Sequence, residues 1–169
     1  MKLLGLLLLG LAVAAFGWTQ ARRLDRRQRT LEQIAGVLAA MEGQMRYLAP
    51  PLEILLDRLR LRPDGAALPF LGEALCRMEA GEAACEALTR SIERHTAALA
   101  LQPEDLRPLA LLAGALGQTD LDGQLAAIAL CREEIGQQLA QARTDCRTHG
   151  LLYRKLGALA GLAVVLLLW

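Results

Sequence analysis

The sequence is poor in aromatic residues and histidines, and it lacks the short motifs that mark many enzyme and metal sites. Two tryptophans, two tyrosines, two phenylalanines and two histidines occur in 169 residues. His95 and His149 have no neighbours at ligand spacing, and none of the four cysteines forms a Cys-x-x-Cys pair. The chain contains no G-x-x-x-x-G-K-[ST], G-x-S-x-G or H-E-x-x-H motif. The sequence therefore predicts no enzymatic activity, no metal and no cofactor.

The charge balance gives no case for nucleic acid, because the formal net charge is only +1. Positive charge is nevertheless concentrated at Arg22, Arg23, Arg26, Arg27 and Arg29. This cluster directly follows an uncharged apolar run from Leu3 to Trp18, so anionic lipid headgroups are its expected partner. The simpler interpretation is that the arginines only set membrane topology.

A second apolar run extends from Leu156 to Trp169, directly after Arg154 and Lys155. Positive charge beside a membrane segment stays on the cytoplasmic side. We therefore expect a transmembrane helix over 1–21, a cytoplasmic domain over 22–149 and a transmembrane helix over 150–169. Both runs are near the short limit of about 17–20 residues for a span. The alternative for the second run is a buried or surface-lying helix.

A secretory signal peptide is the rival interpretation of the N-terminus. Lys2, the leucine-rich core and Ala12-Val13-Ala14 imitate such a peptide, and cleavage would release a secreted helical module. The arginines that follow favour retention in the cytoplasm instead.

Small residues line one face of each apolar run. Gly157 and Gly161 form a G-x-x-x-G pattern, and Gly10, Ala14 and Gly17 make a similar face on the first run. Such faces let membrane helices approach closely, so the two runs are expected to pack on each other or on other subunits.

The central region predicts an antiparallel bundle of about six helices, because helix-forming residues dominate and apolar residues recur at helical spacing. A long stripe from Leu24 to Leu48 ends at Pro50-Pro51, and a helix with Leu52, Leu55, Leu56 and Leu59 follows. Further helices are expected over about 68–80 and 82–99, with a turn at 63–65 before them.

Another helix should start at 102–105 and end at Gly117, with Pro108 either kinking it or delaying its start. Thr119 and Asp122 stand at capping-box spacing before a long last helix. The apolar stripe of that helix is interrupted by Arg132 where an apolar residue would fit. The fold class is thus all-α, a helical bundle flanked by N- and C-terminal transmembrane helices.

Several segments together resemble the stage III sporulation protein AB family of endospore-forming bacteria. They are the opening Met1 to Gly5, Met45-Arg46-Tyr47 before Pro51-Leu52, the corner formed by Leu116-Gly117, Asp120 and Gln124, and the closing segment Lys155 to Leu162. Their order and spacing carry the resemblance, which covers essentially the whole chain.

The resemblance implies a function that composition could not reveal. The family belongs to a channel complex between mother cell and forespore, and it looks like a reduced form of the inner-membrane platform proteins of type II secretion and type IV pilus systems. It implies a location on the mother-cell side, in the outer forespore membrane. It also implies two kinds of partner: a cytoplasmic ATPase, stage III sporulation protein AA, and other membrane subunits of the complex. No catalytic residues come with it.

The candidate partner-contact residues are Tyr47, Gly117, Asp120 and Asp122. They are expected at the membrane-distal end of the bundle, because each lies near the far end of a long membrane-linked helix. Rival functions are a generic scaffold that only self-associates and a membrane enzyme with an unrecognised site.

Overall fold

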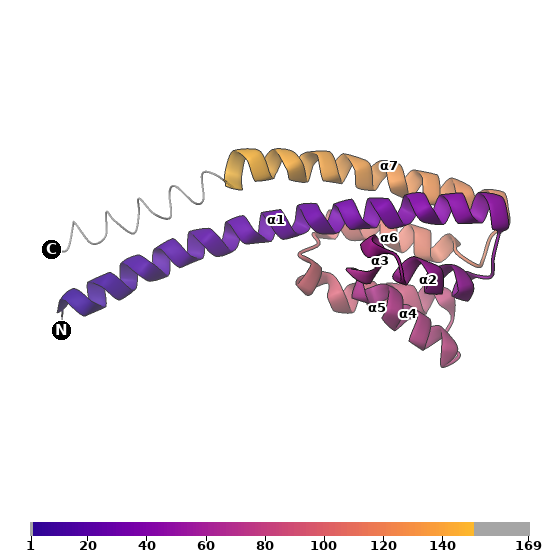
Figure 1. Cartoon of the computed structure of the whole chain (residues 1–169), viewed down its shortest axis with the longest axis horizontal. Helices are drawn as coiled ribbons and strands as arrows, with labels where there is room; N and C mark the ends of the chain where they lie inside the picture. The colour runs from indigo at the N-terminus through magenta and orange to yellow at the C-terminus, as the bar shows by residue number, and fades with distance from the viewer. Residues whose placement is uncertain (1, 151–169) are drawn as a thin grey trace. The chain divides into compact units, whose positions relative to one another are not determined.

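The computed structural model describes the backbone of residues 2–150, and in this range the chain is all helical. Side chains are described at Ala15 and over 18–148. Residues 2–150 hold seven α-helices, one π-helical turn and no strand, which confirms the predicted all-α class (Figure 1). The elements are α1 Lys2–Leu48, α2 Leu52–Arg60, α3 Pro63–Ala66, α4 Pro69–Glu79, α5 Ala84–Leu99, α6 Pro103–Ala115, α7 Leu121–Asp145 and the π-helical turn Cys146–Gly150.

The chain divides into two compact units. One contains residues 1–28 and 141–169, and the other contains residues 29–140. In the part of the chain that the structure describes, no helix combines the length and the apolarity needed to cross a bilayer. The membrane helix predicted over 150–169 lies outside the described residues, apart from the backbone of Gly150, and so do Arg154, Lys155, Gly157 and Gly161. At Gly10, Ala14 and Gly17 the structure describes the backbone alone. These predictions stay predictions.

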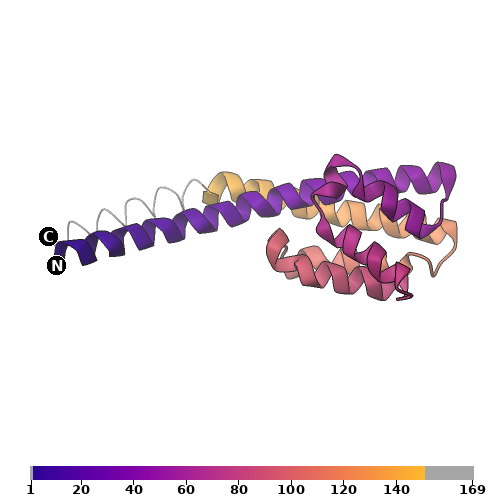
Figure 2. The same cartoon turned by 60° about the horizontal axis from the view of Figure 1, so that its bottom comes forward.

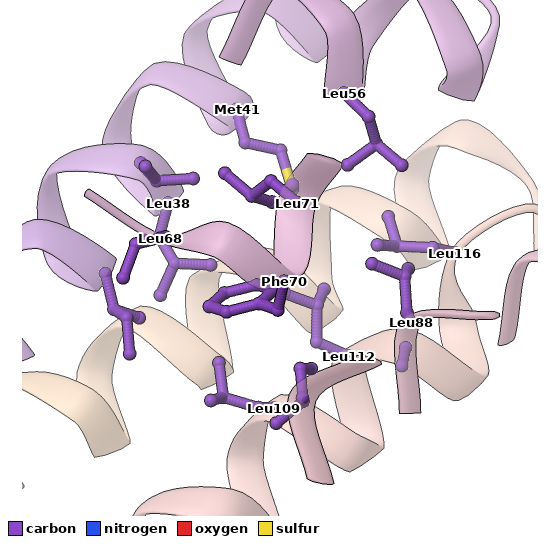
Figure 3. A pocket seen from close by; sticks show the side chains of 14 residues that line it. Leu38, Met41, Leu56, Leu68, Phe70, Leu71, Leu88, Leu109, Leu112 and Leu116 are labelled. Carbon is purple, nitrogen blue, oxygen red and sulfur yellow. The ribbon is translucent and has the colours of Figure 1, made fainter. Parts of the chain in front are cut away.

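The core of the second unit is built on the apolar stripe of α1. Leu31, Ile34, Leu38, Met41 and Met45 are all buried, as their spacing predicts. Leu24 is only half-buried and Leu48 is exposed, so the stripe is shorter at both ends than its sequence pattern suggests. Figure 3 shows how the facing side chains meet, with the ring of Phe70 from α4 among the leucines of α1, α4 and α6. Fully burying a leucine or phenylalanine contributes about 1.5–3 kcal/mol, so this layer supplies much of the stability.

The shorter helices pack on one another beside this stripe (Figure 1). α4 packs against both α2 and α5, and α5 packs against α6. Within this unit α7 lies alongside α1 (Figure 2), and Arg132 of α7 makes an ion pair of 2.6 Å with Glu42 of α1. The hydroxyl of Thr30 donates to the carbonyl of Leu99 over 2.9 Å, which fastens the end of α5 to α1.

A one-turn helix replaces the turn predicted at 63–65. α3 spans Pro63–Ala66 because Pro63 occupies its first turn, where a missing N–H costs nothing. Gly65 is required by the close approach of the chain, since a Cβ there would lie 1.9 Å from the carbonyl oxygen of Leu59. The compactness of this link therefore depends on glycine.

The helix α6 starts at Pro103, so the prediction that Pro108 delays its start was wrong. The backbone N–H of Gln102 donates to the carboxylate of Asp105 over 2.8 Å, which fixes the first turn ahead of Pro108. Pro108 is the sixth residue of the helix and is buried. The N–H that it lacks would serve the carbonyl of Glu104, an exposed residue that water can reach.

The start of α7 lies in the predicted cap region, with Asp120 as the cap in place of a Thr119–Asp122 capping box, and its buried stripe includes the unpredicted Cys131. Asp120 caps the helix, because its carboxylate accepts the N–H of Gly123 over 3.0 Å, whereas the Thr119 hydroxyl donates back to the carbonyl of Ala115. The buried residues are Ile128, Cys131, Ile135, Leu139 and Ala142. Cys131 therefore fills the position that Arg132 seemed to interrupt, since a buried thiol behaves as a small apolar group.

The C-terminus of α5 is closed by an alanine in a left-handed conformation. Ala100 has φ +56°, and the N–H of Leu101 donates to the carbonyl of Thr96 over 3.1 Å. This is the geometry in which glycine is usually found, because a Cβ is unfavourable there.

We expect Ala100→Gly to stabilise the protein by roughly 0.5–1 kcal/mol, since it removes this strain at a modest cost in unfolded-chain entropy. Urea unfolding of the full chain in detergent micelles, followed by circular dichroism, measures the change. Ala110→Gly is the control, because Ala110 is exposed within α6 and glycine there should destabilise by about as much. Equal destabilisation by both variants would contradict the assigned strain.

Candidate functional site

An open hollow among the described residues lies where α1 ends and α7 begins. It has a volume of about 260 Å³ and is lined by residues 49–52 together with Met45, Gly117, Leu121 and Gln124. These residues come from two segments about 70 positions apart in the sequence. We call this hollow the corner groove.

Two chain reversals build the corner groove. The first is the break between α1 and α2, where Ala49 has φ +39° and Pro50-Pro51 prevent the helix from continuing. The second is the α6–α7 corner, where Gly117 has φ +76°, a conformation that glycine adopts without strain. The side-chain amide of Gln124 holds this corner by donating to the carbonyl of Thr119 over 2.9 Å.

Large apolar side chains stand exposed beside the groove. Tyr47 is 84% exposed and Leu48 is 64% exposed, at the last two positions of α1. Leu121, which lines the groove, is 39% exposed. Apolar surface of this kind, gathered beside a hollow, is typical of a site that a partner covers.

The four candidate contact residues lie in the two segments that form the groove. Gly117 lines the groove, and Tyr47 lies in sequence between the lining residues Met45 and Ala49. Asp120 and Asp122 precede and follow the lining residue Leu121. All four are exposed. The structure thus brings together two corners that the sequence treats separately, although a contact with a partner stays a prediction.

The arginine cluster does not share one environment. Arg22, Arg23, Arg26 and Arg29 are exposed, and the guanidinium of Arg22 stacks on the ring of Trp18 at 4.3 Å. Arg27 is buried, and one of its nitrogens lies 3.9 Å from the carboxylate of Asp145. Arg27 therefore shares its charge with α7 in the first unit, which leaves the predicted headgroup contact to the exposed members of the cluster.

A second apolar hollow lies along α6 and α7 and was not anticipated. Leu111 and Leu130, each more than half exposed, line it with Pro108 and Glu134. Its volume is only about 40 Å³, much less than that of the corner groove. Because Leu130 lies next to the buried stripe of α7, its exposure could not be read from spacing alone.

The core cavity of Figure 3 is no ligand site. It is lined by fourteen residues, all of them apolar, and it measures about 40 Å³. A cavity of this size and lining stays dry, because a buried water needs two to four polar partners.

A polar cluster joins α4 to α5. Glu73 accepts from Arg77 over 2.8 Å and from Arg94 over 3.2 Å, and Nε2 of His95 lies 2.8 Å from its second oxygen. Glu82 pairs with Arg77 and Arg90 in the same way. Glu82 lies before α5, which begins at Ala84 and not at Glu82 as predicted. The carboxylates and guanidinium groups satisfy one another, so the cluster is structural.

The hydrogen bonds from Arg77, and then from His95, hold the pKa of Glu73 below its usual value. A lowered pKa contributes stability above the unfolded-state value near 4.5, and that contribution is lost as the pH falls through the folded-state pKa. We expect Glu73→Gln to lower the thermal midpoint at pH 6 and to converge on the wild type by pH 3. Glu79→Gln, at an exposed position of α4, is the control. A deficit at pH 3 as large as at pH 6 would contradict this role.

The cysteines differ in accessibility. All four are free: Cys76 is exposed, Cys131 is buried, and the other two are half-buried. Burial, and then the charge of Glu134, raises the pKa of Cys131 to about 12, so this thiol is inert. Over the described residues, no three His, Cys, Asp or Glu side chains are placed to hold a metal ion.

Comparison with known proteins decides the family. A model of the family described as stage III sporulation protein AB matches residues 2–169. The chain belongs to this family. Membership makes it a sporulation protein, and it confirms the resemblance carried by the sequence segments. No curated protein matches the chain at a significant level.

A solved structure of stage III sporulation protein AB has the same fold. It superposes on this family member with a TM-score of 0.62, and the match covers 72% of this chain and 96% of the other. The sequence identity is 19%, so the likeness concerns the fold alone.

Proposed function

We propose that this family member is a non-enzymatic platform subunit of the mother cell–forespore channel complex, and that its helical bundle docks a cytoplasmic ATPase, stage III sporulation protein AA. The observation that supports the proposal most is the corner groove beside the exposed Tyr47 and Leu48. Tyr47 and Leu48 are adjacent, large and exposed, and contiguous apolar surface beside a hollow favours a site that a partner covers.

The groove is suited to transmit a docking event along the chain. Its two sides are the end of α1 and the start of α7, and these two helices contribute residues to both units of the chain. A partner bound there therefore contacts the helices that we propose to continue into membrane segments at 1–21 and 150–169. In this proposal the central domain is cytoplasmic, and the membrane helices contact other subunits of the channel through their small-residue faces.

The binding experiment uses the full chain in lipid nanodiscs, immobilised, with the purified ATPase in solution with and without nucleotide. We expect saturable binding that depends on nucleotide. Tyr47→Ala combined with Leu48→Ala should weaken it at least about tenfold, because exposed aromatic anchors dominate interface energies.

The matched control is Leu61→Ala, which removes a side chain that is 69% exposed just after the opposite end of α2. It should leave binding unchanged. Absence of binding by the folded wild type would overturn the docking proposal. Strong self-association without ATPase binding would favour a scaffold, for which the exposed Leu111 and Leu130 offer a contact surface.

A further inference from the structure

The size of the corner groove restricts what it can hold. Its volume of about 260 Å³ is below the range of about 300–1,000 Å³ typical of pockets for small ligands and cofactors. It is large enough for one apolar side chain of a partner. Met45 in its wall has a flexible, polarizable side chain that adapts to an inserted group.

The backbone around the groove offers both acceptors and donors. Pro50 and Pro51 have no backbone N–H, and the N–H of Ala49 is already donated to the carbonyls of Gln44 and Met45 at 3.2 Å each. Leu52 and Leu121, which also line the groove, are the first residues of α2 and α7, where the N–H groups have no intrahelical acceptor. The charged side chains around the groove therefore decide which kind of partner group it favours.

The charge around the groove is acidic, whereas the chain as a whole is slightly basic. Residues 45–54 and 116–125 contain Arg46, Glu53, Asp120 and Asp122, which give one positive and three negative charges. Arg46 is engaged, because it pairs with Glu42 over 2.9 Å. The helix starts at α2 and α7 account for the presence of Glu53 and Asp122, since acids are favourable in a first turn. The helix starts do not remove the negative potential that a partner meets at these carboxylates.

We propose that the corner groove receives a partner segment that inserts one apolar side chain and flanks it with lysine or arginine residues. The proposal rests on the proposed docking function and names the chemistry of the ligand at that site. The apolar side chain fills the hollow against Met45 and Leu121, and the flanking cations face Glu53 and Asp122. Specificity then comes from charge, and retention comes from the inserted side chain.

The test measures ATPase binding to the full chain in nanodiscs between 50 and 500 mM NaCl. We expect the affinity to fall as salt rises, mainly through the association rate. Asp122→Lys should weaken binding on the order of tenfold and flatten the salt dependence, and Asp122→Asn should have a smaller effect in the same direction. Leu121→Ala should speed dissociation at every salt concentration, because it removes part of the apolar wall.

The control is Glu133→Lys, which makes the same change of charge at an exposed position in the middle of α7. It should bind like the wild type, and thermal unfolding of every variant verifies the fold. Binding that is insensitive to salt, or equally weakened by Asp122→Lys and Glu133→Lys, would overturn the basic-segment proposal and leave the platform function standing.

A second probe separates the two proposals if the ATPase does not bind. A peptide with a central phenylalanine flanked by arginines should then still bind the wild type in preference to the same peptide with glutamates in place of the arginines. Equal affinity for the two peptides would overturn the inference independently of the ATPase.

Discussion

The apolar stripe of α1 from Leu31 to Met45 is the surface on which the second unit depends. A single helix cannot bury such a face alone. Each of the shorter helices is therefore stabilised by the apolar side chains that it packs against the stripe. α4 brings Phe70 and Leu71, and α6 brings Leu109 and Leu112. The ring of Phe70 lies at the centre of this arrangement (Figure 3), which explains how a sequence with so few aromatic residues still forms a dense core.

Polar contacts fix the register of the helices once the apolar layer has formed. The Thr30 hydroxyl on the Leu99 carbonyl and the Glu42–Arg132 pair each join segments far apart in the chain. The Glu73 cluster does the same between α4 and α5. Because Arg132 and Arg94 are more than half exposed, their ion pairs are screened and contribute little energy each. These ion pairs instead select one alignment of helices whose apolar faces could otherwise pack in more than one register.

The helices were largely predictable, because periodic leucines and the Pro50-Pro51 and Gly117 signals mark elements and their ends locally. The errors occurred at the links between helices, where contacts between neighbouring elements are not visible in a periodic pattern. Gly65 of α3 lies against the Leu59 carbonyl, and Glu82 lies before α5 and pairs with Arg77 and Arg90. The candidate site followed the same pattern. The sequence indicated its two corners separately, but the groove between them forms only through tertiary packing. The exposure of Leu130 depends on tertiary packing as well.

The corner groove is better explained by a function than by folding. Ala49 is held at φ +39° at its edge, a conformation that costs about 1 kcal/mol or more for a residue with a Cβ. Glycine would relieve that strain, as it does at Gly117 on the other side. Tyr47 and Leu48 add exposed apolar area at the same place, although the α1 stripe is already complete at Met45. Tyr47 and Leu48 are thus exposed apolar residues that the packing of the bundle does not require, which agrees with the proposal that a partner covers this surface.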